Sequence, residues 1–437
     1  MRRYAKLAVW AAVLTAAIAG CSDRPLMPTP NLYLGRTDNP FADVPKEFQS
    51  NEIDLLYVTD RKPITAKGGS LQYGHQRSTS MAFGSCIIEI GKDVKWPVLV
   101  KNSRTAQRSV SLGLKMARIV EHARFPSTPL QVISGPDGLV KNPALIAKRK
   151  QIAAKLQDDI ARRLKKTKTK EAFIYLHGFN NTFDDSAFVS AELWHFLGRR
   201  GVPIVYSWPA KRSIFGYGYD RESSEFTVFH FKQFLRTVAG CKDVKKIHIV
   251  AHSRGTDVAA SAFRELVIAA NAAPRSVGSG PDTPGKAAHK VLDKVGHVIL
   301  AAADIDMEVA SQRLVAEMAF MSAEKVTIYL SHEDKALNLA VWLFESIGRI
   351  GELSLSIFTP SDMETLETID RIDFVDARVN TSFLGHAYFH ASPAVSSDLI
   401  LLLRDNLEPG NGRPLTCDER STRYWSIGKD YPYTDDK

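Results

Sequence analysis

Cysteine is scarce in this chain: the 437 residues contain four, and three of them follow position 21. These three are Cys86, Cys241 and Cys417. Because their number is odd, they cannot all pair in a closed disulfide framework, although one disulfide could form. None has the spacing of a zinc knuckle, and His177, His252 and His332 share no metal-ligand spacing on one helix. We therefore expect no metal ion and no cofactor.

Long apolar runs are also missing, with one exception near the start. Residues 7–18 are apolar and follow three basic residues, but the run is shorter than the ~20 residues that span a bilayer. This pattern is typical of a secretory signal peptide, and an uncleaved anchor would share it. The run ends in Ile18-Ala19-Gly20-Cys21, which resembles the lipobox of bacterial lipoproteins. We predict a signal peptide over residues 1–20 and acylation, with chains such as palmitate, at Cys21.

The residues after the lipobox bear on where the protein is sorted. Ser22 follows the cysteine, and in Gram-negative lipoproteins such a neighbour fits the outer membrane, although Asp23 leaves the inner membrane open. We expect a lipid-anchored protein of the cell envelope, on the periplasmic face of the outer membrane. Residues 21–50 are rich in Pro, Asn and Asp, and we interpret them as a flexible tether.

Acidic residues are outnumbered: 48 Asp and Glu stand against 57 Lys and Arg, a net charge of +9. The densest basic run, residues 162–170, closes a predicted helix. We interpret it as a solvated face or a membrane-surface contact. Since basic and aromatic residues do not interleave as on a nucleic-acid-binding surface, we expect no nucleic-acid partner.

Short apolar segments alternate with helical ones along most of the chain. Strands are predicted at residues 53–59, 84–90, 172–176, 202–208, 246–252, 298–301, 326–330 and 372–376, and helices near residues 144–166, 184–197, 223–238, 335–347 and 393–404. Such alternation predicts an α/β fold with a mostly parallel sheet and helices on both faces. We assign this domain to residues 51–405 and a polar, loose C-terminal tail to residues 406–437.

The stretch around Ser253 is the strongest candidate for a catalytic site. A run rich in β-branched residues, 246–252, leads to this serine, and a predicted helix begins at Ser253. This strand–turn–helix pattern is that of a nucleophile elbow, in which the residues two before and two after the serine are small. Ala251 and Gly255 hold those positions. A buried strand followed by a helix that the serine caps would give the same local pattern.

Other reactive side chains also follow predicted strands. They are His177, Asp304, Asp334 and His386. A serine hydroxyl becomes nucleophilic when a histidine takes its proton, and a carboxylate orients that histidine. In α/β-hydrolases the chain order is serine, acid, histidine. The candidates here are Ser253, then Asp304, Asp306 or Asp334, then His386 or His390.

A second motif could complete an oxyanion hole. His177-Gly178-Phe179-Asn180 follows a buried strand, as does the loop that supplies one oxyanion donor in α/β-hydrolases. The backbone N–H of Phe179 is our candidate donor, with the N–H of Arg254 as its partner. A plain turn, with Gly178 at positive φ, is the alternative.

Several motifs together resemble an uncharacterised family of bacterial α/β-hydrolase-like proteins, often described only as a domain of unknown function. The motifs are Tyr57-Val58-Thr59-Asp60-Arg61, His177-Gly178-Phe179-Asn180, Ser207-Trp208-Pro209, Tyr219-Asp220, Ala251-His252-Ser253-Arg254-Gly255, Ala303-Asp304-Ile305-Asp306, residues 331–337 and Gly385-His386-Ala387-Tyr388. The resemblance implies an α/β-hydrolase fold and places the catalytic histidine at His386 rather than His390. That family usually has Met where this chain has Arg254.

The acid is predicted at Asp334, because residues 331–337 form a short loop between a strand and a helix, as at the usual acid site. Asp304 is the alternative acid, and Asp306 the predicted N-cap of the helix from about Met307. We interpret the chain as a membrane-anchored serine hydrolase that cleaves carboxylic esters, including lipid esters, or thioesters. The alternative is a catalytically silent envelope lipoprotein that uses the fold as a binding module.

The lipoprotein hypothesis predicts the behaviour of one variant. The full-length protein should partition into the detergent phase, and Cys21→Ser should release it or leave it unprocessed, because several acyl chains anchor stably where one does not. Phase separation followed by immunoblotting measures this. Recovery of the unaltered protein wholly in the soluble fraction would contradict the hypothesis.

Overall fold

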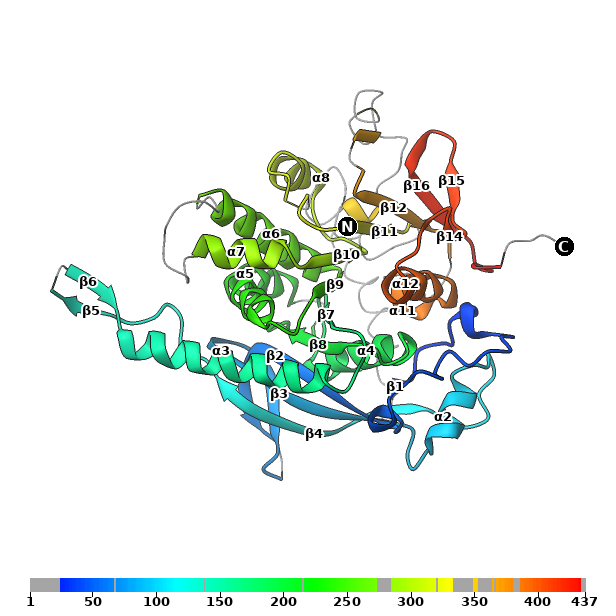
Figure 1. Cartoon of the computed structure of the whole chain (residues 1–437), viewed down its shortest axis with the longest axis horizontal. Coiled ribbons are helices and arrows are strands. Elements are labelled where there is room, and N and C mark those ends of the chain that lie inside the picture. Colours follow the sequence, from blue (N-terminus) through cyan, green and yellow to red (C-terminus); the bar gives the residue numbers. More distant parts are fainter. Residues whose placement is uncertain are drawn as a thin grey trace, which may run out of the picture.

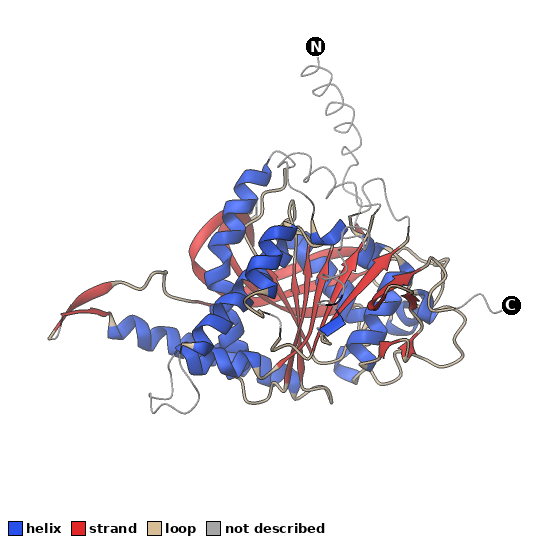
Figure 2. Cartoon of the chain, turned by 90° about the horizontal axis from the view of Figure 1, so that it is seen from above, coloured by secondary structure: helices blue, strands red, loops and turns tan. Residues whose placement is uncertain are grey.

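The computed structural model of the protein describes residues 24–66, 68–136, 138–213, 216–272, 284–319, 321–332, 349–352, 364, 367–368, 370–379 and 386–433. In this part of the chain one sheet of twelve strands runs through the molecule, with helices on both faces (Figures 1 and 2). Along the sheet the strands follow the order β1-β4-β3-β2-β8-β7-β9-β10-β11-β12-β16-β15. The predicted α/β fold is therefore confirmed.

The elements have the following bounds. The strands of the sheet are β1 (Arg24–Pro25), β2 (Glu52–Thr65), β3 (Leu71–Ile90), β4 (Gly113–Arg124), β7 (Glu171–Leu176), β8 (Val202–Ser207), β9 (Lys246–His252), β10 (Val295–Ala301), β11 (Lys325–Leu330), β12 (Ile372–Ala377), β15 (Thr416–Asp418) and β16 (Ser421–Ile427). Two small sheets pair β5 (Val132–Gly135) with β6 (Gly138–Lys141) and β13 (Glu408–Pro409) with β14 (Gly412–Arg413). The helices are α2 (Trp96–Asn102), α3 (Pro143–Leu164), α4 (Phe183–Phe196), α5 (Tyr217–Gly240), α6 (Arg254–Asn271), α7 (Pro284–Leu292), α8 (Met307–Ala310), α11 (Tyr388–Ala391) and α12 (Pro393–Asp405). Within the described residues, none of these helices combines the length and apolar character that a membrane span needs.

The central strands, from β2 to β12 and on to β16, pair in parallel. Their side chains alternate between two apolar layers: Ile174 and Ile249 belong to one, Tyr175 and Val250 to the other. Helices α3, α5, α6 and α7 cover the first layer, and α4 and α12 cover the second. Because both faces are buried, nearly every strand position is apolar, which is why the sequence shows continuous apolar runs.

The N-terminal segment differs from the prediction of a flexible tether over residues 21–50. Its described part, residues 24–50, packs against the domain: β1 pairs with β4, and Leu26, Tyr33 and Phe41 are buried. The backbone N–H of Met27 donates to the buried carboxylate of Glu192 on α4, at 2.6 Å. Composition misled the prediction, because prolines and polar residues mark irregular backbone but do not exclude buried side chains between them.

The described part of the C-terminal segment, residues 406–433, also packs against the domain, contrary to the predicted loose polar tail. β16 pairs in parallel with β12, and β15 closes that edge of the sheet (red in Figure 1). Fully buried Asp398 on α12 accepts two hydrogen bonds from Arg413, at 2.9 and 2.6 Å, and one each from Tyr329 and Tyr431. Arg413 and Tyr431 of this segment therefore satisfy a buried carboxylate of α12.

This network predicts unequal effects for two otherwise similar arginines. Arg413→Met leaves the Asp398 carboxylate buried without its cation and should lower the free energy of unfolding by about 3–5 kcal/mol. Arg420 pairs with Asp418 in the same two-bonded way but at the surface, so Arg420→Met should leave stability unchanged. Urea unfolding followed by tryptophan fluorescence measures both. Equal shifts would show that burial of the pair is unimportant.

Candidate active site

Ser253 has the backbone geometry of a nucleophile elbow. It lies between β9 and α6 with φ 52° and ψ −126°, a conformation that costs a non-glycine residue about 1–3 kcal/mol. Its N–H donates to the carbonyl of Ala301, at 2.9 Å. Gly255 allows the helix to approach β7, because a Cβ there would lie 2.4 Å from the carbonyl oxygen of His177. The small residue that the elbow pattern requires is thus explained by this contact.

The loop of residues 177–181 lies directly against the serine. A Cβ on Gly178 would be 2.6 Å from the Ser253 Cβ, so only glycine permits this approach. The alternative of a turn with Gly178 at positive φ is wrong, since the positive φ falls on Asn180 instead, at 60°. Phe179, the candidate oxyanion donor, follows Gly178, and its ring contacts that of Tyr217 with centroids 5.3 Å apart.

A buried arginine supports this loop from beneath. Arg61, at the end of the first family-like motif, is 1% exposed, and its guanidinium donates to the carbonyls of Asn181 (2.8 Å) and Ala210 (3.0 Å). Its Nε donates to Ser207 Oγ at 2.9 Å. Burial, and then the charge of Arg61, lower the pKa of His177 well below its usual 6.5. His177 is therefore held neutral under the loop and does not fit the role of catalytic base.

Asp220 fixes the same loop from a second side. Its carboxylate accepts the backbone N–H of Asn180 at 3.1 Å and that of Lys211 at 2.6 Å. Burial raises the pKa of Asp220 to about 6. Arg61 and Asp220 belong to the family-like motifs of the sequence, but no role was predicted for them. The sequence did indicate one, because a charged residue next to a buried apolar strand needs a hydrogen-bond or ion-pair partner.

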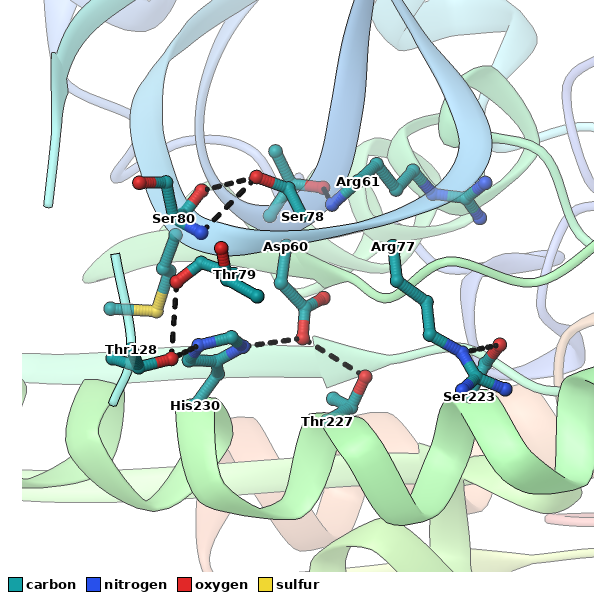
Figure 3. Close-up of polar contacts among 12 residues, drawn as sticks. Asp60, Arg61, Arg77, Ser78, Thr79, Ser80, Thr128, Ser223, Thr227 and His230 are labelled. Atoms are coloured by element: carbon teal, nitrogen blue, oxygen red, sulfur yellow. Dashed lines mark hydrogen bonds and ion pairs between the residues drawn. The ribbon is translucent and has the colours of Figure 1, made fainter. Parts of the chain in front are cut away.

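Asp60, beside Arg61 on β2, contacts two side chains of α5 (Figure 3). Its Oδ2 accepts from Thr227 Oγ1 at 3.0 Å and lies 3.1 Å from His230 Nδ1, both on α5. His230 Nε2 lies 2.7 Å from Thr128 Oγ1, which also bonds the carbonyl of Thr79. The series carboxylate, imidazole, hydroxyl resembles a triad, but its hydroxyl, on Thr128, bonds a main-chain carbonyl. We interpret this series as a structural hydrogen-bond network that joins β2 to α5.

His386 contacts His252, the residue that precedes Ser253 at the elbow. The ring centroids are 4.8 Å apart, and His252 Nε2 donates to the His386 carbonyl at 3.0 Å. Burial lowers the pKa of His252 well below 6.5, so this ring acts as a neutral donor. Burial also lowers the pKa of His390, to about 3, which makes it a poor base.

Of the two candidate acids, Asp334 lies outside the described residues, and Asp304 lies within them. Asp304 accepts a hydrogen bond from Tyr217 at 2.6 Å and lies 3.6 Å from Arg254 Nη1 and 3.5 Å from Arg349 Nε. Its described partners are a phenol and two guanidinium groups, which suit a structural role. Asp306 caps α8, as predicted, by accepting the N–H groups of the second and third residues of the helix.

Arg254 does not present its charge at the elbow. The side chain is 6% exposed and turns toward two carboxylates: Nη2 bonds Asp257, and Nη1 bonds the Asp304 carbonyl at 3.1 Å. The charges of Asp257 and Asp304 raise the pKa of Arg254 despite its burial. The part of Arg254 that the predicted oxyanion hole would use is its backbone N–H, on the first residue of α6. Among the described residues, no group of three or more His, Cys, Asp or Glu could hold a metal ion.

The Asp304 network predicts a separation of stability from reactivity. Asp304→Asn removes a carboxylate shared by two arginines and should cost about 3 kcal/mol of stability. A triad acid changed to Asn would cost about 10⁴-fold in kcat, whereas we expect Asp304→Asn to retain activity within about tenfold. Asp306→Asn, which keeps a good N-cap residue, is the control. A 10⁴-fold loss with unchanged stability would make Asp304 the triad acid.

Two comparisons with known proteins complete the description of the site. A search of curated proteins finds no match. The family described as "Alpha/beta hydrolase of unknown function (DUF900)" matches residues 152–404, which include the elbow, the 177–181 loop and His386. Since this match spans more than half of the chain, the protein belongs to that family of alpha/beta hydrolases of unknown function.

Proposed function

We propose that this protein is a serine hydrolase, anchored by acylated Cys21 at the periplasmic face of the outer membrane, that cleaves carboxylic ester or thioester bonds. The observation that carries the proposal is the positive φ of Ser253, at the point where the 177–181 loop touches the serine. Strained backbone persists where the surroundings impose it, and it concentrates at active sites.

The proposed reaction proceeds through an acyl-enzyme. Ser253 Oγ attacks the carbonyl carbon while His386 takes the hydroxyl proton, and the oxyanion accepts from the N–H groups of Phe179 and Arg254. His386 returns the proton to the departing alcohol or thiol as the bond to carbon breaks. Water then attacks the acyl-enzyme with His386 as base and releases the acid and free serine. Asp334 is the proposed carboxylate that orients His386.

The rival function is a silent envelope protein that keeps the fold as a binding module. It would need the core and the surface but not a strained serine, since glycine at that position would relieve the strain. It would also have no need of a neutral His252 that donates to the carbonyl of His386. These features favour the hydrolase.

The proposal predicts covalent reactivity at one residue. The chain from residue 22, which retains every described residue, should hydrolyse short activated esters and react with a fluorophosphonate at Ser253. Ser253→Ala should lose at least about 10³-fold in kcat, and Ser261→Ala on α6 is the matched control. Ser253→Gly should be equally inactive but more stable by about 1 kcal/mol, because the strain is relieved. Equal labelling of all forms would contradict the assignment of Ser253 as the nucleophile. If the unaltered protein does not react with the probe and Ser253→Gly is only more stable, the binding module is favoured.

A further inference from the structure

The hairpin of β5 and β6, with the first turns of α3, extends away from the body of the protein (Figures 1 and 2). We call described residues 132–135 and 138–151 the arm. Its two strands pair only with each other and form a sheet separate from the central one. Neither the elbow nor its supporting network includes any residue of the arm, so the fold of the site does not explain it.

The arm carries apolar side chains into solvent. Leu139 is 79% exposed, the highest value among the large exposed hydrophobic residues of the described chain. Val132 is 51% exposed and Val140 is 40% exposed. Exposed apolar residues are ordinary when scattered, but a group of them at the end of a projecting element marks a surface that contacts something else.

The apolar residues lie on both faces of the hairpin. Ser134 pairs with Leu139 and Ile133 with Val140. Since successive side chains of a strand point to opposite faces, Val132 and Leu139 share one face while Ile133 and Val140 share the other. A groove on a folded partner would cover one face and leave the other in water. Lipid acyl chains surround an inserted tip and cover both.

The charge of this region matches an anionic surface. Residues 131–151 contain four Lys and Arg and a single acidic residue, Asp137. Lys141 at the base of the hairpin and Lys148 and Lys150 on α3 are exposed. Apolar side chains at a tip with basic side chains behind it form the arrangement that binds at a bilayer interface, where cations meet phosphate groups.

We propose that the arm binds the surface of an anionic phospholipid bilayer, with the side chains of Val132, Leu139 and Val140 toward the acyl chains and the lysines at the headgroups. The binding requires neither acylation of Cys21 nor reactivity of Ser253. With a lipid anchor it would supply a second attachment point, because stable association of a peripheral protein takes two signals.

Vesicle co-sedimentation tests the proposal with the chain from residue 22. The protein should bind vesicles of phosphatidylglycerol and phosphatidylcholine, bind pure phosphatidylcholine far less, and lose affinity at high salt. The double variant Leu139→Ser, Val140→Ser should lose at least about tenfold in affinity. Ile268→Ser, which changes a 43% exposed residue on α6, is the matched control and should bind normally.

Two results would overturn the proposal. One is equal vesicle binding by the parent and the double variant when both show the same thermal midpoint. The other is an absence of binding by the parent together with a dimer, seen in sedimentation velocity, that the double variant loses. That second result would assign the arm to a second copy of the chain. Ester hydrolysis, measured in the same samples, shows whether the proposed enzyme is active independently of whether the arm binds vesicles.

Discussion

The close approach of three backbones is the constraint on which the rest of this site depends. The end of β7, the turn at Ser253 and the first turn of α6 lie so near one another that Gly178 and Gly255 have no room for a Cβ. This packing holds the serine at φ 52°. Because a strained turn persists only where its surroundings impose it, the supporting residues matter as much as the serine.

Those supporting residues are mostly buried charges. A charge removed from water must be paired or hydrogen bonded, and here several of these contacts join separate elements. Asp60 and Arg61 join β2 to α5 and to the 177–181 loop. Arg254 joins the elbow to the end of β10 through Asp304. Buried titratable groups next to the candidate site therefore need not be catalytic: several of them position the backbone at Ser253.

The sequence predicted the features that follow from local regularity. Apolar runs revealed the central strands, because both of their faces are buried, and the small residues around Ser253 predicted the elbow, because its geometry excludes side chains. The packing of residues 24–50 and 406–433 was missed, since irregular segments are buried through single contacts without periodicity, such as Met27 on Glu192 or Arg413 on Asp398. The roles of Arg61 and Asp220 were missed for a related reason: their partners are main-chain groups far away in the sequence.

The family match begins at residue 152 and ends at residue 404, yet the working unit extends beyond both limits. Arg61 reaches the 177–181 loop from β2, which precedes the match. Arg413, in a segment that follows the match, pairs with the buried carboxylate of Asp398 on α12. Residues outside the match therefore complete the support of residues inside it. The arm also precedes the match but contributes nothing to that support. Its exposed apolar tip consequently has no explanation in the fold, and such a tip requires one in what the protein contacts.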